Sequence, residues 1–388
     1  MNPAPLPDDP TANPQDPPHV HSCGATLTAL AALGSSPTGN RPDGNRTANG
    51  FHTRFADDLE VLANHGVTDL RLGFDWSRLQ PRAAMGSSLD GQWTEWYRDV
   101  LRAGNNHGVR VWATLLESNI PRWFDDERGF LDARGSGRHW PRFVEGTAEC
   151  FGDLVAGWFP IDDPLAVAGR TEPNDPRRHG EVVDTLAVAW RDAWRVLRGG
   201  PPVATSLGVR MVRPVDATVP AAQAARREDH LRWTTFTRAL RDGVLSIPGR
   251  ADRVIDDLAG ASDIVGVRIR VDMGDDARLD DESLRRWQER ATTMLHRLAE
   301  TTPDRPLAVS SFAAARRGVR ETAADAELFT ESFGRAVDSA IGDGIDLRHR
   351  FMDPAIAVDS RHVSGLVDWN RAPTPAGVAW IAGRNRPT

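Results

Sequence analysis

The sequence predicts an α/β protein that folds as a single (β/α)8 barrel, or TIM barrel. Short apolar segments alternate with longer amphipathic ones over most of the 388 residues, which is the pattern of strands followed by helices. Eight strand–helix pairs can be recognised, and eight parallel strands are the number that closes a barrel. No segment rich in Pro and Ser interrupts the alternation, so we expect one domain.

The predicted strands are short apolar runs, and the predicted helices lie between them. The strands are expected at residues 20–28, 67–74, 109–116, 157–162, 203–210, 263–269, 306–310 and 346–352. The helices are expected at 52–65, 94–107, 138–155, 181–198, 221–242, 279–300, 323–342 and 374–383. The seventh helix shows one apolar face at helical spacing, formed by Leu328, Phe329, Phe333, Ala336, Val337, Ala340 and Ile341.

Composition and charge exclude several classes of protein. Hydrophobic residues make up 40% and charged residues 26%, which is typical of a globular protein with a sizeable core. The net charge is −7 and no basic tract stands out, so we expect no nucleic-acid partner. No run approaches the roughly 18 apolar residues of a membrane span, so we expect no membrane association.

The N-terminal segment predicts a disordered leader ahead of the barrel. Residues 1–19 are rich in Pro, Asp and Asn, a composition that buries little apolar surface, and the barrel is expected to occupy residues 20–388. The segment lacks the basic and apolar regions of a signal peptide, which favours a cytoplasmic location. There Cys23 and Cys150 would be free thiols, although one disulfide is the alternative. We found no metal-ligand spacing, so we expect no metal and no cofactor.

Polar residues follow several predicted strands at the point where each strand ends. Asp162 and Asp163 follow the fourth strand, Glu117 follows the third, and Ser310 and Ser311 follow the seventh. In a (β/α)8 barrel the groups that carry out chemistry lie at the C-terminal ends of the strands and in the loops that follow. We therefore expect these side chains to face one pocket.

A series of motifs along the chain is similar to those of glycoside hydrolase family 1, the retaining β-glucosidase family. The motifs are at residues 55–58, 65–67, 70–78, 114–116, 120–121, 129–130, 151–153 and 158–164, with weaker ones at 263–267 and 365–368. Each motif is modest, but their order and spacing are specific. The resemblance extends from about residue 22 to the C-terminus, and it implies the TIM barrel of that family.

The resemblance also implies where the catalytic groups of the family should stand. A retaining glycosidase uses two carboxyl groups about 5–5.5 Å apart, one as acid/base and one as nucleophile. The acid/base glutamate is replaced by Asp163 and the nucleophile by Ser311. Sugar-binding positions differ as well, since Ala31, Glu117 and Ile269 stand at three of them. The resemblance therefore predicts the scaffold but places the retaining reaction in doubt.

The basic and aromatic candidates have alternative interpretations. Arg71 stands where the family places an Arg beside the nucleophile, and a buried guanidinium needs an anion, which Glu117, Asp163 or an anionic ligand would supply. Arg268 and Arg270 flank the mouth at the sixth strand and with Arg71 would form a basic pocket for a carboxylate or phosphate. A rim salt bridge is the alternative for at least one of them. Trp76 is a candidate for substrate binding, with barrel packing as its favoured alternative.

The acidic and hydroxyl candidates are likewise open to two readings each. Asp162 and Asp163 form an acid/base pair if their pKa values are pushed apart, or they cap the turn at Pro164. Glu117 is the candidate for which a role in the site is favoured. Ser311, like Ser310, is expected to fill the space of a bulkier side chain.

Three functions follow from these alternatives. The first is a repurposed, non-hydrolytic enzyme that acts on an anionic or glycosylated small molecule, with Glu117, Asp162 or Asp163 in acid/base roles. The second is a non-catalytic pseudo-glycosidase that binds a ligand or a protein partner. The third is residual O-glycosyl hydrolysis through Asp163, with Glu117 opposite it at the wider separation of an inverting enzyme, roughly 6.5–9.5 Å. The sequence leaves the substrate and the oligomeric state open.

Overall fold

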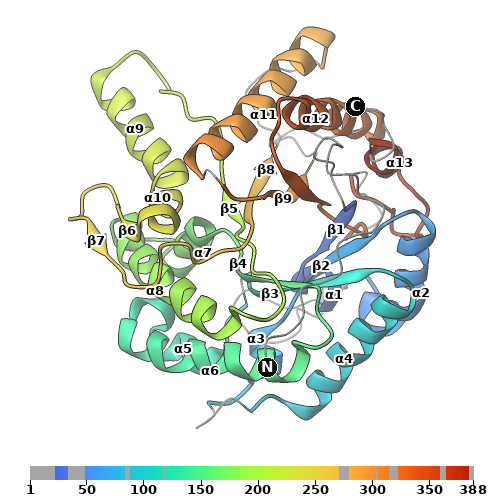
Figure 1. Cartoon of the computed structure of the whole chain (residues 1–388), viewed down its shortest axis with the longest axis horizontal. Coiled ribbons are helices and arrows are strands. Elements are labelled where there is room, and N and C mark those ends of the chain that lie inside the picture. Colours follow the sequence, from blue (N-terminus) through green and yellow to red (C-terminus); the bar gives the residue numbers. More distant parts are fainter. Residues whose placement is uncertain are drawn as a thin grey trace.

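A closed ring of eight parallel strands surrounded by helices forms the body of the protein (Figure 1). The structure, a computed structural model, describes residues 22–33, 49–83, 88–117, 119–270, 279–302, 304–313, 322–358 and 364–383. This is the predicted (β/α)8 barrel. The predicted leader, residues 1–19, lies outside the described residues.

All eight predicted strands are confirmed. In chain order the barrel strands are β1 (Gly24–Leu27), β2 (Asp69–Gly73), β3 (Arg110–Leu116), β4 (Gly157–Ile161), β5 (Leu207–Gly208), β8 (Val265–Arg270), β9 (Leu307–Ala313) and β10 (Leu347–Met352). Neighbouring strands pair in parallel in the order β4-β3-β2-β1-β10-β9-β8-β5. A parallel bridge between Trp158 and Val203 joins the two ends of this order and closes the ring.

The eight predicted helices are also present, one of them as two helices. They are α2 (Phe51–Asn64), α4 (Gly91–Asn106), α6 (Ala133–Phe151), α8 (His179–Leu197), α9 (Val219–Trp233), α10 (Thr235–Asp242), α11 (Asp281–Thr301), α12 (Ala323–Gly342) and α13 (Pro375–Ala382). The single helix predicted at 221–242 is interrupted at Thr234. Two successive β-branched residues weaken the helix there, and the hydroxyl of Thr235 donates a hydrogen bond to the carbonyl of Ser246, 2.8 Å away.

The sequence did not predict the short elements. These are the helices α1 (Ala29–Leu33), α3 (Trp76–Leu79), α5 (Arg122–Asp126) and α7 (Pro164–Thr171), two 3-10 turns at Gly129–Leu131 and Pro176–Arg178, and the antiparallel pair β6 (Val244–Leu245) and β7 (Arg253–Val254). A helix of four to eight residues completes too few turns for an apolar period to stand out. Each of these four helices follows the C-terminal end of a barrel strand, so they help to shape the mouth of the barrel.

The apolar face predicted for α12 is confirmed except at one position. Phe333 stacks on Phe312 of β9 at 4.2 Å, and the other predicted residues from Phe329 to Ile341 are buried. Leu328 is 38% exposed instead. It directly precedes Phe329, and one residue corresponds to about 100° around a helix, so the two side chains cannot both face the sheet.

An aromatic layer fills the interior of the barrel below the mouth. Trp112, Phe159 and Phe351 pack against one another there, with ring centroids 5.7–6.3 Å apart. A Cβ atom on Gly157 would lie 2.2 Å from the ring of Trp112, so only glycine leaves room for this indole. The layer forms a rigid floor beneath the polar residues at the strand ends.

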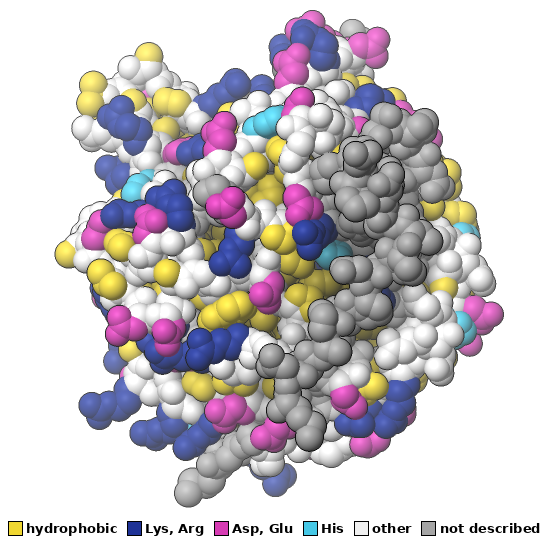
Figure 2. All heavy atoms as spheres, in the orientation of Figure 1, with side chains coloured by type: hydrophobic (Ala, Val, Ile, Leu, Met, Phe, Trp, Pro, Cys, Tyr) yellow, Lys and Arg dark blue, Asp and Glu magenta, His cyan; other side chains and the backbone are white. Residues whose placement is uncertain are grey.

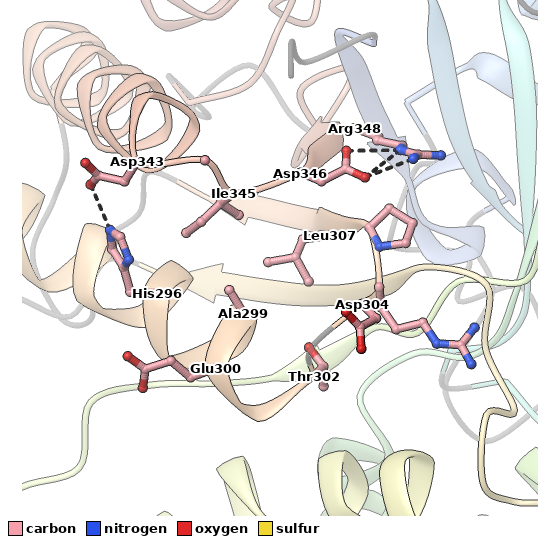
Figure 3. A pocket seen from close by; sticks show the side chains of 13 residues that line it. His296, Ala299, Glu300, Thr302, Asp304, Leu307, Asp343, Ile345, Asp346 and Arg348 are labelled. Carbon is pink, nitrogen blue, oxygen red and sulfur yellow. Dashed lines mark hydrogen bonds and ion pairs between the residues drawn. The ribbon is translucent and has the colours of Figure 1, made fainter. Parts of the chain in front are cut away.

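A cavity of about 630 Å³ lies at the other end of the barrel, beside the starts of β9 and β10 (Figure 3). Four of its charged side chains form two pairs: His296 lies 3.0 Å from Asp343, and Arg348 lies 2.9 Å from Asp346. Because it opens at the N-terminal ends of the strands, this cavity is separate from the predicted site.

Candidate active site

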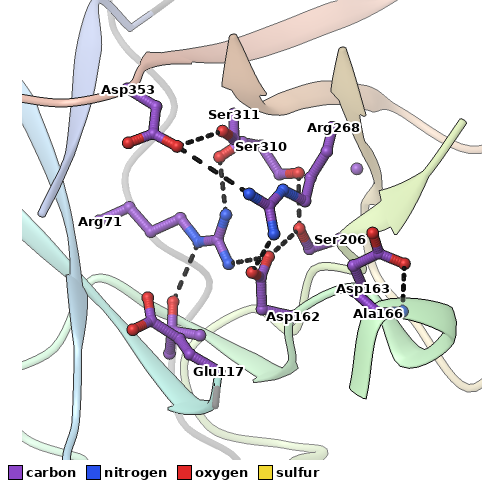
Figure 4. Close-up of polar contacts among 12 residues, drawn as sticks. Arg71, Glu117, Asp162, Asp163, Ala166, Ser206, Arg268, Ser310, Ser311 and Asp353 are labelled. Carbon is purple, nitrogen blue, oxygen red and sulfur yellow. Dashed lines mark hydrogen bonds and ion pairs between the residues drawn. The ribbon is translucent and has the colours of Figure 1, made fainter. Parts of the chain in front are cut away.

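A cluster of polar side chains gathers at the C-terminal ends of the barrel strands (Figure 4). Arg71 comes from β2, Glu117 follows β3, and Asp162 follows β4. Arg268 comes from β8 and Ser311 from β9. The parallel ring brings these five residues together although up to 240 positions separate Arg71 from Ser311 in the sequence. Of the residues that were expected to face one pocket, Glu117, Asp162 and Ser311 lie in this cluster.

Arg71 is the centre of the cluster and is only 1% exposed. Its guanidinium donates to Asp162 Oδ1 at 2.6 Å, to Thr114 Oγ1 at 2.9 Å and to the carbonyl of Ser310 at 2.9 Å. The guanidinium also lies over the ring of Phe159, 4.5 Å from its centroid. Such a set of contacts on every side fixes the orientation of Arg71.

The anion that neutralises Arg71 is therefore Asp162. Of the two acids that were expected in this role, neither Glu117 nor Asp163 forms the ion pair with Arg71. The reason is positional: the backbone N–H of Asp162 bonds to the carbonyl of Leu116 at 2.7 Å, which continues the β3–β4 ladder and directs the carboxylate toward the barrel axis. Asp163, one residue later, has a different backbone conformation and points elsewhere.

Asp162 is a buried carboxylate that stays ionised. It also accepts hydrogen bonds from Ser206 Oγ at 2.6 Å and from Arg268 at 2.5 Å. Burial alone would raise its pKa, but the guanidinium groups of Arg268 and Arg71 and the Ser206 hydroxyl outweigh burial and hold the pKa well below its ordinary value. A carboxyl group in this state cannot donate a proton at neutral pH.

The basic residues do not form the predicted open basic pocket. Arg268 is paired with Asp162, and its other guanidinium nitrogen lies 4.0 Å from Asp353. Burial would lower the pKa of Arg268, but these two carboxylates raise it. Arg71 is enclosed, and Arg270 at the end of β8 is exposed. Of the three candidates, only Arg268 both belongs to the cluster and remains partly accessible, with 13% of its side chain exposed.

Glu117 is the titratable group of the cluster that is suited to proton transfer near neutral pH. Its Oε2 accepts a hydrogen bond from the backbone N–H of Ala29 at 2.9 Å, and its carbonyl accepts one from Arg170. Burial and the negative charge of Asp162 raise its pKa to about 7, against the opposing effects of Arg71 and the Ala29 hydrogen bond. An acid/base group works best when its pKa lies close to the working pH.

Gly73 at the end of β2 leaves the space in which the Glu117 carboxylate meets Ala29. A Cβ atom at Gly73 would lie 2.5 Å from both the Ala29 nitrogen and Glu117 Oε2. We expect Gly73→Ala to lower the free energy of unfolding by about 1–3 kcal/mol, because one of the two atoms is backbone and cannot move aside. Gly91→Ala is the matched control, since nothing lies within 4 Å of its Cβ position. Equal denaturation midpoints for the two variants would contradict this role of Gly73.

Asp163 caps a helix, so the capping alternative holds for this residue. It is the N-cap of α7, with a φ of 48°, and its Oδ1 accepts a hydrogen bond from the N–H of Ala166 at 3.2 Å. Its own N–H donates to the carbonyl of Ser206 at 2.7 Å. Asp162 takes no part in this cap. Two adjacent acids therefore have separate structural roles.

We expect Asp163→Ala to lower the free energy of unfolding by about 1 kcal/mol, because it removes the capping oxygen. Asp163→Gly should cost less than Asp163→Ala, since glycine is tolerated as a cap and adopts positive φ without strain. Thermal denaturation of both variants would measure the difference. If the glycine variant were the less stable of the two, the capping role would be refuted.

The two serines of β9 bond within the cluster. Ser310 Oγ lies 2.8 Å from Ser206 Oγ, and Ser311 Oγ donates to Asp353 Oδ2 at 3.0 Å. Both serines are buried. Ser311 thus positions a carboxylate on the neighbouring strand end in addition to filling space.

Trp76 lies outside the cluster. It is fully buried, its ring lies 4.9 Å from that of Phe143 and 4.7 Å from that of Phe124, and its N–H donates to Gln80 at 2.9 Å. These contacts favour the packing interpretation over substrate binding.

Sequence reasoning missed three residues of the cluster: Ser206, Asp353 and Arg170. Asp353 directly follows the eighth strand, so the strand-end rule that selected Glu117 and Asp162 could have found it. Ser206 stands in an apolar run where a small polar residue is no signal by itself. Arg170 lies in α7, a helix that was not predicted.

The face that carries the mouth is shown in Figure 2, where Arg, Asp and Glu side chains surround a recessed, partly hydrophobic area near its centre. Among the described residues no group of three or more His, Cys, Asp and Glu side chains is arranged to hold a metal ion. Within the same ranges no helix has both the length and the apolar character that a membrane span requires. Cys23 and Cys150 are not joined in a disulfide.

A closed ring of eight parallel strands, each followed by helices, defines the protein as a TIM barrel. The sequence profile of glycosyl hydrolase family 1 matches residues 37–243, more than half of the chain. The chain belongs to this family.

Relatives and solved structures are consistent with this assignment. Beta-glucosidase 32 of Arabidopsis thaliana is 25% identical over 159 residues, which are 39% of this chain and 29% of that protein. Human Klotho is 27% identical over 182 residues, 45% of this chain and 18% of that protein. The chain thus spans less than a third of these relatives' own length.

The structural neighbours cover almost the whole chain. A family 1 β-glucosidase from Thermotoga maritima matches with a TM-score of 0.74 and 14% identity, over 94% of this chain and 97% of its own. The AHE enzyme from Alicyclobacillus herbarius gives a TM-score of 0.76 and 16% identity, over 96% and 98%. At such identities the likeness establishes the fold alone.

Proposed function

We propose that the protein is an enzyme that acts on a small molecule at the barrel mouth, with Glu117 as the proton donor and acceptor. The observation that carries the proposal is the state of Glu117: a buried carboxyl group at a strand end, held by the Ala29 N–H, whose pKa is raised to about 7. Perturbed pKa values of this kind concentrate at functional sites. The Arg71–Asp162 ion pair lies beside Glu117 and holds two charged groups in fixed positions there.

The reaction we propose differs from retaining glycoside hydrolysis. The loss of the family's two catalytic glutamates is supported by what their replacements do. Asp163, at the acid/base position, has its carboxylate in a helix cap. Ser311, at the nucleophile position, donates its hydroxyl hydrogen to Asp353, and a serine hydroxyl supplies no negative charge to the oxocarbenium-like transition state of glycoside hydrolysis. The alternative of hydrolysis through Asp163 is weakened by the first of these contacts.

The alternative of a non-catalytic, ligand-binding relative predicts a different outcome. A binding protein has no need of a proton-transfer group, so neutralising Glu117 would leave its ligand affinity intact and no turnover would be found.

A cytoplasmic location and the absence of a cofactor also remain predictions.

The test is a turnover screen with matched variants. The purified protein would be incubated with nitrophenyl β-glycosides and with small sugars, sugar acids and sugar phosphates, and products would be followed by mass spectrometry. We expect a substrate outside the simple glycosides, turned over at least about 100-fold more slowly by Glu117→Gln. Asp343→Asn, at the opposite end of the barrel, should keep the wild-type rate. Turnover unaffected by Glu117→Gln, or glycoside hydrolysis that depends on Asp163, would overturn the proposal.

A further inference from the structure

Arginine side chains from three different elements meet at the mouth, and they differ in what neutralises them. Arg71 of β2 and Arg268 of β8 both form ion pairs with Asp162, at 2.6 and 2.5 Å. Arg170, in the last turn of α7, donates a hydrogen bond to the carbonyl oxygen of Glu117. In the part of the chain that the structure describes, this carbonyl is its only hydrogen-bond partner and no carboxylate forms an ion pair with it.

The two ends of α7 fix Arg170 beside Glu117. At the N-terminal end, directly after β4, Asp163 caps the helix and Pro164 begins it. At the C-terminal end the positive charge of Arg170 is favoured by the helix dipole, and the guanidinium reaches back to the end of β3 through the Glu117 carbonyl. Arg170 is therefore in direct contact with the residue to which we assign proton transfer.

Arg170 has donors to spare and is accessible. A guanidinium carries five N–H donors in a planar fork, and one bond to a carbonyl oxygen leaves most of them available. The residue is exposed, so a ligand in the mouth can reach these donors. Arg71 differs in both respects, since it is 1% exposed and bonded on every side. The open cation expected at the mouth is therefore Arg170 and not Arg71.

The charges around Arg170 favour a further anion. Partial burial of its guanidinium lowers the pKa of Arg170 and the nearby charge of Arg268 lowers it further, while the attraction of Asp162 does not cancel these effects. Arg268 itself, which has a carboxylate in contact, shows a raised pKa instead. Both groups remain protonated at any physiological pH. An anion beside Arg170 would supply the missing attraction and reduce the repulsion between the two guanidinium groups.

We propose that Arg170 binds an anionic oxygen group of the substrate, a carboxylate or a phosphate, next to Glu117. The inference rests on the proposed function and deepens it by naming the class of substrate, which is an anionic small molecule. The planar fork of arginine matches the oxygens of a carboxylate or a phosphate with two parallel hydrogen bonds. Arg268 stays engaged with Asp162, so Arg170 is the group that makes the direct contact.

Binding measurements with three probes test the proposal. Glucose 1-phosphate and glucuronate carry the two candidate anions on the same sugar, and glucose is their neutral counterpart. Isothermal titration calorimetry on the full-length protein gives the dissociation constants. We expect one of the anionic sugars to bind about 10- to 100-fold more tightly than glucose, because charge-assisted hydrogen bonds are stronger than neutral ones. Which of the two binds more tightly shows whether the anion is a phosphate or a carboxylate.

Variants of Arg170 show whether this residue makes the contact. Arg170→Gln removes the charge but keeps an N–H donor for the Glu117 carbonyl, and it should reduce the affinity for the anionic sugar to that for glucose. Arg170→Lys keeps the charge without the fork and should have an intermediate affinity. The matched control is Arg227→Gln, which removes an exposed charge from α9, a helix that projects away from the barrel (Figure 1). It should bind the probes as the wild type does, and thermal unfolding would show that each variant is folded.

Two results would overturn the inference: neither anionic sugar binding more tightly than glucose, or a preference for the anion that Arg170→Gln leaves unchanged. Glu117→Gln keeps this failure distinct from failure of the proposed function, because the contact with the anion does not require the Glu117 proton. If turnover depends on Glu117 but anion affinity does not depend on Arg170, only this inference falls. If Arg170 holds the anion but Glu117→Gln leaves turnover unchanged, the proposed function falls and the anion site stands.

Discussion

Replacing Asp162 with alanine is expected to lower the free energy of unfolding by about 3–5 kcal/mol, because it leaves two guanidinium groups in the barrel without their buried carboxylate. Arg71 is 1% exposed and its Nη2 nitrogen lies 2.6 Å from Asp162, so water cannot replace the lost partner. Arg268 and Ser206 would lose a hydrogen-bond acceptor as well. Urea denaturation, with the slope m checked for constancy, measures the loss.

The control for this variant is an ion pair at the protein surface. His296 and Asp343 lie 3.0 Å apart, and their side chains are 38% and 55% exposed. Asp343→Ala should therefore change the stability by less than about 1 kcal/mol. If Asp162→Ala cost no more than this control, Asp162 would not be the counter-ion that holds the cluster together.

The fold could be predicted from the sequence because its signals are local and repeated. Each barrel strand is a short apolar run, and each long helix has several turns over which an apolar face can be recognised. The exceptions follow from the same reasoning. A helix as short as α7 has too few turns to show a period. The break at Thr234 depends on the hydrogen bond from Thr235 to Ser246, and Ser246 lies outside the predicted helix.

The sequence predicted where the candidate site lies, but not which of its residues contact one another. The strand-end rule selected Glu117 and Asp162, the family resemblance selected Arg71, and the structure brings the three residues together. Which acid meets Arg71 depends on the register of β3 and β4 and on the side to which one backbone turns. Asp162 continues the ladder, whereas Asp163 has a φ of 48° and turns its carboxylate toward α7. No property of two adjacent aspartates in a sequence distinguishes these outcomes.

The sequence could not predict the protonation state of Glu117 either. Its pKa depends on how completely the carboxyl is buried and on its proximity to Asp162 and Arg71, which are features of the assembled ring. The sequence identified the residue, and the structure supplies the reason for its chemistry.

The stability of the protein is expected to fall as the pH rises from about 4.5 to about 7, through the titration of Glu117. In the unfolded chain the carboxyl loses its proton near pH 4.3, whereas in the folded protein its pKa is raised to about 7. Below the lower value the group is protonated in both states. Between the two values the unfolded chain binds fewer protons, so deprotonation favours unfolding by about 3 kcal/mol in total.

Glu117→Gln isolates this contribution, because the amide has nearly the same shape, does not titrate, and keeps an oxygen that can accept from the Ala29 N–H. We expect the stability of the wild-type protein relative to this variant to decline by about 3 kcal/mol between pH 4.5 and 8. Denaturant unfolding of both proteins at several pH values measures the difference, in which the titration of all other groups cancels. A difference that does not change with pH would mean that Glu117 has an ordinary pKa, and the basis for its acid/base role would then be lost.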